Sequence, residues 1–207
     1  MSVNDCAAIV LAAGASTRLG RPKQLVQLNG ETLLRRTARL ALEAGCSPVI
    51  VVLGFEAERV QQTLGGLKVR IVLNPDWPTG MASSLRCGIE AIEEEPPGSS
   101  SGFGERGAFC ERVLLLVSDQ PHLSTAVLQS LLLKNSQTQS LITASRYAER
   151  SGVPAIFRRP LFSELKGIAG DKGARQIIER HRNQATFVDF PEGAFDLDTP
   201  EDLKALI

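Results

Sequence analysis

The sequence predicts a single α/β domain in which helices cover both faces of a mostly parallel central sheet. Short, continuous apolar runs recur along the first half of the chain, as in strands buried on both faces. Segments with helical periodicity separate these runs, and this alternation indicates right-handed βαβ units. The length of 207 residues suits one domain with a full core, so the expected domain is residues 1–207.

Four apolar runs predict the strands of the first half, at residues 6–12, 49–53, 69–73 and 113–117. Helical patterns are expected at 33–44, 56–64 and 81–94. Thr32 suits the N-cap of the first of these helices, and Gly45 suits its end. Polar loops follow the first, third and fourth strands, at 14–23, 74–80 and 118–121. Because ligands bind outside the carboxyl ends of parallel strands, these loops should gather at one edge.

The second half has a weaker pattern, and we expect it to be irregular. Strands are predicted at 141–145, 153–157 and 186–190, with residues 147–152 as a connection between the first two. Helices are predicted at 160–166, 171–181 and 199–207. The last begins Thr199-Pro-Glu-Asp, a favourable start because Thr caps the helix and acids lie near its positive end.

Residues 95–110 are rich in Pro, Gly and Ser and have no hydrophobic periodicity. This composition predicts a mobile surface loop, with a functional lid as the alternative. A domain boundary is disfavoured, because the strand at 113–117 completes the same sheet.

The composition excludes several classes of partner and location. Lys plus Arg equals Asp plus Glu at 23 each, which disfavours nucleic acid and anionic lipid surfaces. No apolar run approaches the roughly 20 residues that span a bilayer, and the first residues do not resemble a signal peptide. The four cysteines are widely spaced and read as small core residues. We therefore expect a cytoplasmic protein that does not bind membranes.

The most informative segment for chemistry runs Leu11-Ala-Ala-Gly-Ala-Ser-Thr-Arg-Leu-Gly-Arg-Pro-Lys23. The small residues let the backbone approach a ligand, and the N–H groups can face an anion together with Ser16. Arg18, Arg21 and Lys23 add three cations within six residues. The spacing fits neither a Walker loop nor the dinucleotide fingerprint. A tight turn with solvated basic residues is the alternative reading.

Asp119 follows the strand at 113–117 within Ser118-Asp-Gln-Pro121 and is a candidate ligand for magnesium, which prefers carboxylates and phosphate oxygens. Helix capping is its alternative role, although Ser124 can supply that cap. His122 and His181 are expected to have surface or capping roles.

The loop at 11–23 resembles the signature loop of the nucleotidyltransferase superfamily. Four further segments resemble its molybdenum cofactor cytidylyltransferase branch, and the resemblance runs from Ala8 to Leu203. They are Asn74-Pro-x-Trp-x-x-Gly-Met-x-Ser-Ser84, Asp119-Gln-Pro121, Gly170-Asp-Lys-Gly-Ala-Arg175 and Asp196-Leu-Asp-Thr-Pro-Glu-Asp-Leu203. The branch usually has Gly-His-Pro where this chain has Gly152-Val-Pro154, so the acceptor is less well defined than the nucleotide.

The resemblance implies a Rossmann-like nucleotidyltransferase fold and a set of site residues. Arg18 would hold the departing pyrophosphate, Lys23 the α-phosphate, and Asp119 with Asp198 a Mg²⁺ ion. The residues expected to bind the nucleotide are Leu11, Ala12, Ala13, Gly14, Ser16, Gly80, Ser83 and Ser84. Two acids beside a triphosphate repel it, so we expect a bound ion to be what brings Asp119 and Asp198 together.

The implied reaction moves CMP from CTP onto the phosphate of a pterin, with transient contact to a molybdenum enzyme or its chaperone. Ala13 favours CTP, because relatives that use GTP tend to have Gly there. The alternatives are a GTP-dependent enzyme for the same pterin and a cytidylyltransferase for a sugar or polyol phosphate. A carrier that inserts the cofactor without turnover is the alternative from another class.

Overall fold

The computed structural model describes residues 6–94, 110–170 and 173–206, and its centre is a seven-stranded sheet of order β5-β4-β1-β6-β8-β7-β9. Neighbouring strands β5, β4, β1 and β6 are parallel. Strand β8 is antiparallel to β6 and β7, and β9 is parallel to β7. The strands are β1 (Cys6–Ala12), β4 (Val49–Leu53), β5 (Arg70–Leu73), β6 (Arg112–Val117), β7 (Ile142–Tyr147), β8 (Arg150–Arg158) and β9 (Ala185–Asp189). The predicted α/β class with a mostly parallel sheet is confirmed.

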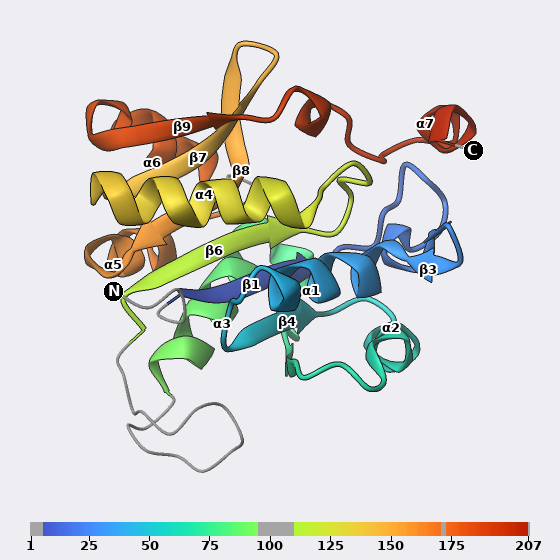
Figure 1. Cartoon of the computed structure of the whole chain (residues 1–207). Helices are drawn as coiled ribbons and strands as arrows, with labels where there is room; N and C mark the ends of the chain where they lie inside the picture. Colours follow the sequence, from blue (N-terminus) through green and yellow to red (C-terminus); the bar gives the residue numbers. More distant parts are fainter. Residues whose placement is uncertain (1–5, 95–109, 171–172, 207) are drawn as a thin grey trace.

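Helices cover both faces of this sheet (Figure 1). Helices α1 (Leu33–Glu43) and α4 (Thr125–Thr138) pack on one face, against Ala8 and Val10 of β1. Helices α3 (Met81–Glu93), α5 (Phe162–Lys166) and α6 (Arg175–Arg180) pack on the other, against Ala7 and Ile9. The remaining elements are the helices α2 (Ala57–Gln61) and α7 (Pro200–Leu206) and the small hairpin β2 (Gln27–Leu28) and β3 (Glu31–Thr32).

The residues that the sequence offers as helix caps lie at the ends of α1, α4 and α7. Thr32 caps α1 through its hydroxyl, which accepts from the Arg35 N–H, and Gly45 follows the helix with φ 91°. Ser124 caps α4 by accepting from the Val127 N–H. Asp202 accepts from the Thr199 N–H at 2.8 Å and so fixes the start of α7. Asp119 is therefore not needed as a cap.

The second half of the chain is more regular than predicted, because its strands extend the same sheet. Residues 147–152 are not a connection: β7 runs to Tyr147, and β8 begins at Arg150. Only Ala148 and Glu149 turn the chain, with φ 45° and 59°. Two-residue hairpin turns with positive φ usually contain Asn or Gly, so Ala-Glu gave no signal. The β2–β3 hairpin, which has Asn29-Gly30 at its turn, was also missed.

Two predictions involve segments at or beyond the limits of the described structure. The helix expected at 171–181 begins only at Arg175, and residues 171 and 172 lie outside the described residues. The loop predicted at 95–110 lies outside them too, except for Cys110. In the described ranges, each helix falls short of the length and apolarity needed to cross a bilayer.

Candidate active site

The loop after β1 is held by one buried side chain. Gln24 is 1% exposed, and its amide nitrogen donates to the carbonyls of Ala12 and Gly14, each at 2.8 Å. The Ser16 hydroxyl accepts from the Lys23 N–H at 3.1 Å. Ser16 itself has φ 54°. These bonds fix the curve of the loop around the predicted anion site, and the role of Gln24 was not predicted.

Four residues predicted for catalysis and metal binding meet at the carboxyl ends of β1 and β6. The Lys23 ammonium contacts the Asp119 carboxylate and lies 3.2 Å from Asp198 Oδ1. Arg18 donates to Asp198 Oδ2 at 2.8 Å. Asp119 follows β6 and Asp198 precedes α7, and the Leu197 N–H donates to the Asp119 carbonyl at 2.9 Å. Arg21 is exposed.

The cluster of Lys23, Asp119 and Asp198 corrects the expectation that only a bound ion unites the two acids. The Lys23 ammonium already lies between them and offsets their repulsion. Burial alone would lower the pKa of Lys23, but the charges of Asp119 and Asp198 and their hydrogen bonds outweigh it and raise that pKa. Lys23 therefore stays protonated within the cluster.

Asp196 is a further carboxylate of the site, and sequence reasoning missed it. Burial of its carboxyl group, followed by the negative charges of Asp119 and Asp198, raises its pKa to about 6. A hydrogen bond from Gln120 and the charge of Lys23 act in the opposite direction. Asp196 as a whole residue is nevertheless exposed to solvent. Its position two residues before Asp198 was the available signal.

The residues present fit a divalent cation. Asp119 Oδ1 is buried and has no hydrogen-bond partner, and carboxylate oxygens are the ligands that Mg²⁺ prefers. Within the described ranges, no group of three His, Cys, Asp or Glu residues is arranged to hold a metal. Asp119 and Asp198 would supply two ligands, and phosphate oxygens and water would complete the coordination shell of the ion, as is usual for magnesium.

The loop after β5 is organised by Asn74, a buried residue. Its amide nitrogen donates to the hydroxyls of Ser83 and Ser84, both at 2.9 Å. Ser83 in turn donates to the carbonyl of Gly80, which has φ 113°. The serine hydroxyls therefore shape the start of α3, and their direct contact with a nucleotide remains a prediction, as it does for Gly80 and for residues 11–14.

Gln120, next to Asp119, joins the candidate site to the second half of the sheet. Its amide nitrogen donates to the carbonyls of Val153 in β8, at 3.2 Å, and Gly193, at 3.4 Å. His122 is exposed and His181 is the C-cap residue of α6, in line with the surface or capping roles expected for them. His122 packs edge-on against Phe195, with ring centroids 5.5 Å apart, and His181 Nε2 lies 2.7 Å from a Glu164 oxygen.

Residues 8–185 match the family described as the MobA-like NTP transferase domain. The chain is 30% identical to a nicotine blue oxidoreductase from Paenarthrobacter nicotinovorans, over 96% of this chain and 95% of that protein. It is 28% identical to a probable molybdenum cofactor guanylyltransferase from Nostoc sp., over 99% and 91%.

Among solved structures, Rv0371c from Mycobacterium tuberculosis matches with a TM-score of 0.77 and 28% identity, over 99% of this chain and 98% of that chain. A structure of that protein in complex with manganese matches with a TM-score of 0.74 and 27% identity, over 97% of each chain. These similarities do not distinguish a cytidylyltransferase from a guanylyltransferase.

Proposed function

The chain belongs to the MobA-like NTP transferase domain family, and on this premise we propose that it transfers CMP from CTP to the terminal phosphate of the molybdenum cofactor pterin, releasing pyrophosphate. The observation that carries the proposal is the cluster of Lys23, Asp119 and Asp198 at the carboxyl ends of β1 and β6. Phosphoryl-type transfer depends mainly on positioning and charge neutralisation, and this cluster can supply both.

In the proposed reaction, an oxygen of the acceptor phosphate forms a bond to the α-phosphorus while the bond to the pyrophosphate oxygen breaks. Arg18 would hold the pyrophosphate, and Lys23 would leave the carboxylates to contact the α-phosphate. Asp119 and Asp198 would hold Mg²⁺, which when bound offsets charge on the phosphate oxygens. An acceptor phosphate monoester is already ionised at neutral pH, so no side chain needs to remove a proton from it.

The choice of CTP rests on Ala13, whose methyl group can bias a base pocket by only about 1–3 kcal/mol. GTP is the second candidate, favoured by the name of the Nostoc relative. Thermal-shift measurements with four nucleoside triphosphates and magnesium rank the bases, because a ligand at 100 times its Kd stabilises the fold by about 2.7 kcal/mol. CTP is expected to give the largest shift.

Pyrophosphate release separates the proposed class of reaction from the others. A cofactor carrier would release none, and neither would a redox reaction of the kind that the name of the Paenarthrobacter relative describes. A sugar or polyol phosphate that supports release in place of the pterin would move the proposal to another nucleotidyltransferase.

The decisive variant is Asp119→Asn, compared with Asp189→Asn as a control that removes one carboxylate from an exposed pair with Arg146. Without metal, Asp119→Asn should bind CTP at least as tightly as the parent, because one negative charge beside the phosphates is gone. With magnesium the order should reverse, and transfer should fall by several orders of magnitude. If magnesium strengthens CTP binding equally in the parent and in both variants, Asp119 is not a metal ligand.

A further inference from the structure

Tyr147, the only tyrosine of the chain, ends β7 in a space that two glycines leave free. Its hydroxyl donates to the Val153 carbonyl at 3.3 Å. A Cβ atom at Gly152 would collide with that hydroxyl, and a Cβ atom at Gly193 would lie 3.1 Å from the tyrosine ring. Tyr147 is half-buried, so part of the residue remains exposed to solvent.

The strand directions place Tyr147 at the same edge of the sheet as Asp119. Strand β8 is antiparallel to both β6 and β7, so β6 and β7 point the same way. Gln120 adds a direct connection, because it donates to the carbonyls of Val153 and Gly193, the two backbone groups next to the tyrosine. Burial, followed by the charge of Asp196, raises the pKa of Tyr147, so its phenol is neutral.

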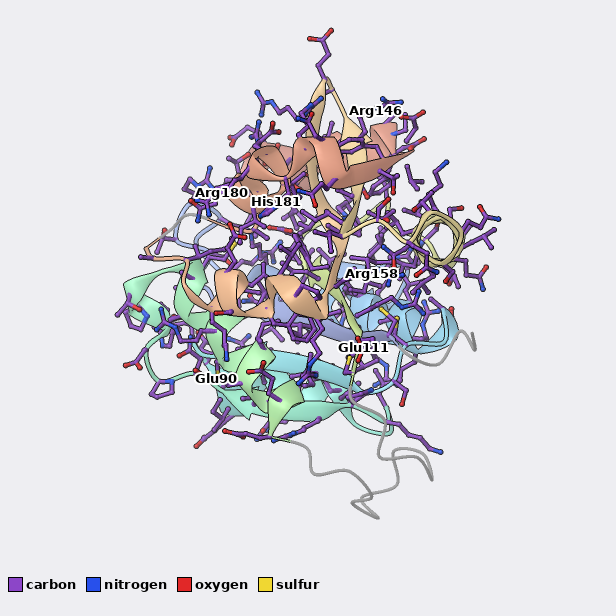
Figure 2. The ribbon with its side chains drawn as sticks, turned by 90° about the vertical axis from the view of Figure 1, so that its left-hand side faces the viewer. Glu90, Glu111, Arg146, Arg158, Arg180 and His181 are labelled. Atoms are coloured by element: carbon purple, nitrogen blue, oxygen red, sulfur yellow. The ribbon has the colours of Figure 1, made fainter. Side chains whose placement is uncertain are left out.

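Two arginines near this tyrosine differ from their neighbours, because neither pairs with an acid among the residues that the structure describes. Arg150 begins β8 directly opposite Tyr147 in the pairing of β7 with β8. Arg175 begins α6, which lies against β8, where the Ser151 hydroxyl donates to Glu179 at 3.1 Å. The positive charge of each arginine acts to lower the pKa of Tyr147. Within the described part of the chain, neither makes a side-chain hydrogen bond or ion pair. Arg146 on β7, by contrast, pairs with Asp189 at 2.8 Å, and Arg180 on α6 pairs with Glu164. Figure 2 labels both of these arginines.

We infer that Tyr147, Arg150 and Arg175 bind the acceptor: the guanidinium groups hold its phosphate, and the tyrosine ring lies against its heterocycle. The inference rests on the proposed function and adds the residues that bind its acceptor. Guanidinium groups recognise phosphate through charge-assisted hydrogen bonds and also stack on flat rings. The nearby carboxylate of Asp196 can accept hydrogen bonds from ring N–H groups, which a sugar or polyol phosphate lacks. The site therefore fits a phosphorylated, N–H-bearing heterocycle.

The test measures inorganic phosphate binding by calorimetry, in protein whose signature loop is already filled with nucleotide and magnesium. Arg150→Gln and Arg175→Gln should each weaken phosphate binding about tenfold, the loss expected for one charge-assisted hydrogen bond. Arg146→Gln and Arg180→Gln are matched controls, because they remove the same charge from the same hairpin and the same helix. Both controls should stay within about twofold of the parent.

Two outcomes overturn the inference: equal weakening in all four variants, which would be an effect of net charge, and a nucleotide-loaded parent that binds no phosphate. Neither outcome touches the proposed function, which fails only if the parent binds no nucleotide or releases no pyrophosphate.

Turnover gives a second readout. Arg150→Gln and Arg175→Gln should raise the KM for the pterin acceptor and leave the KM for the nucleotide unchanged. Tyr147→Leu should raise the same acceptor KM, and Tyr147→Phe, which keeps the ring, should restore it. An equal rise in the nucleotide KM, or a Phe variant as poor as the Leu variant, would contradict the assigned contacts.

Discussion

Lys23 shows how one residue can serve two states of the same site. The ammonium group of Lys23 contacts Asp119 and lies 3.2 Å from Asp198, in the space where these acids would hold a divalent ion. Metal binding must therefore displace the ammonium group, and an incoming phosphate gives that group a new partner. On this basis, nucleotide and metal should enter the site together.

This competition predicts that Lys23→Ala binds Mn²⁺ more tightly than the parent when nucleotide is absent, by about tenfold or more, because no internal cation opposes the ion. Transfer should nevertheless be largely lost, since the α-phosphate loses its cation. Paramagnetic resonance of free Mn²⁺ measures the affinity. Lys166→Ala, which removes a lysine paired with Glu93 far from the cluster, is the control. Equal affinities in parent and Lys23→Ala would show that the lysine does not occupy the metal position.

Most residues that carry charge in the candidate site could be predicted from the sequence, with Asp196 as the exception, and the residues that position them could not. Arg18, Lys23 and Asp119 stand in segments whose spacing is distinctive. Gln24 and Gln120 were missed as positioning residues, because a glutamine amide gives no pattern until the backbone carbonyls that it contacts are known.

The short β2–β3 hairpin stabilises the start of α1 through an ion-pair network that the sequence did not reveal. Glu31 accepts two hydrogen bonds from Arg39, at 2.8 and 3.0 Å, and Arg39 also donates to Glu43. The hydrogen bonds from Arg39 are the largest influence on Glu31 and lower its pKa below the ordinary value of 4.5. The bidentate contact links Glu31, two positions before α1, to Arg39 in the middle of the helix.

Glu31→Gln should lower the free energy of unfolding at neutral pH by up to about 1 kcal/mol, since the pair is partly exposed. The pKa of Glu31 is lower in the folded state than in the unfolded state. The contribution of Glu31 to the free energy of unfolding is therefore present above pH 4.5 and is lost as the pH falls through the folded-state pKa. Urea titrations across this range should show the parent and the variant converging at acid pH. A difference that persists there would contradict the ionic origin of the contribution.

Elements were predicted well where one physical signal dominates. Strands β1, β4 and β6 are continuous apolar runs because they are buried on both faces, and their bounds agree with prediction to about a residue. Strand β5 lies at the edge of the sheet and is only partly buried. The tight turn between β7 and β8 was not predicted, because Ala148 and Glu149 adopt a backbone conformation that their residue types do not indicate. The second half was expected to be irregular, although strands were predicted at 141–145, 153–157 and 186–190. These three strands are present, and they extend the same sheet.

The Pro- and Gly-rich segment 95–110 begins and ends at the end of the sheet that is remote from the candidate site. Residue 94 precedes it, and its last residue, 110, comes just before the start of β6, whereas Asp119 follows the end of that strand. Deletion of residues 97–107 should therefore leave nucleotide affinity within about twofold and the melting temperature nearly unchanged. Calorimetry and thermal melts check this, and loss of nucleotide binding would identify the insertion as a lid.

Arg18 and Asp198 are separated by 180 positions in the sequence, yet they close the same cluster. A chain that has folded β1 to β6 but has not docked the segment before α7 has only part of this site. Contacts between such distant segments form late, because the entropy of closing long loops must be overcome first. During refolding, tight capture of metal with nucleotide should thus appear with the slowest phase, after most secondary structure has formed. The time course of ligand binding would then report the rate of the final folding step.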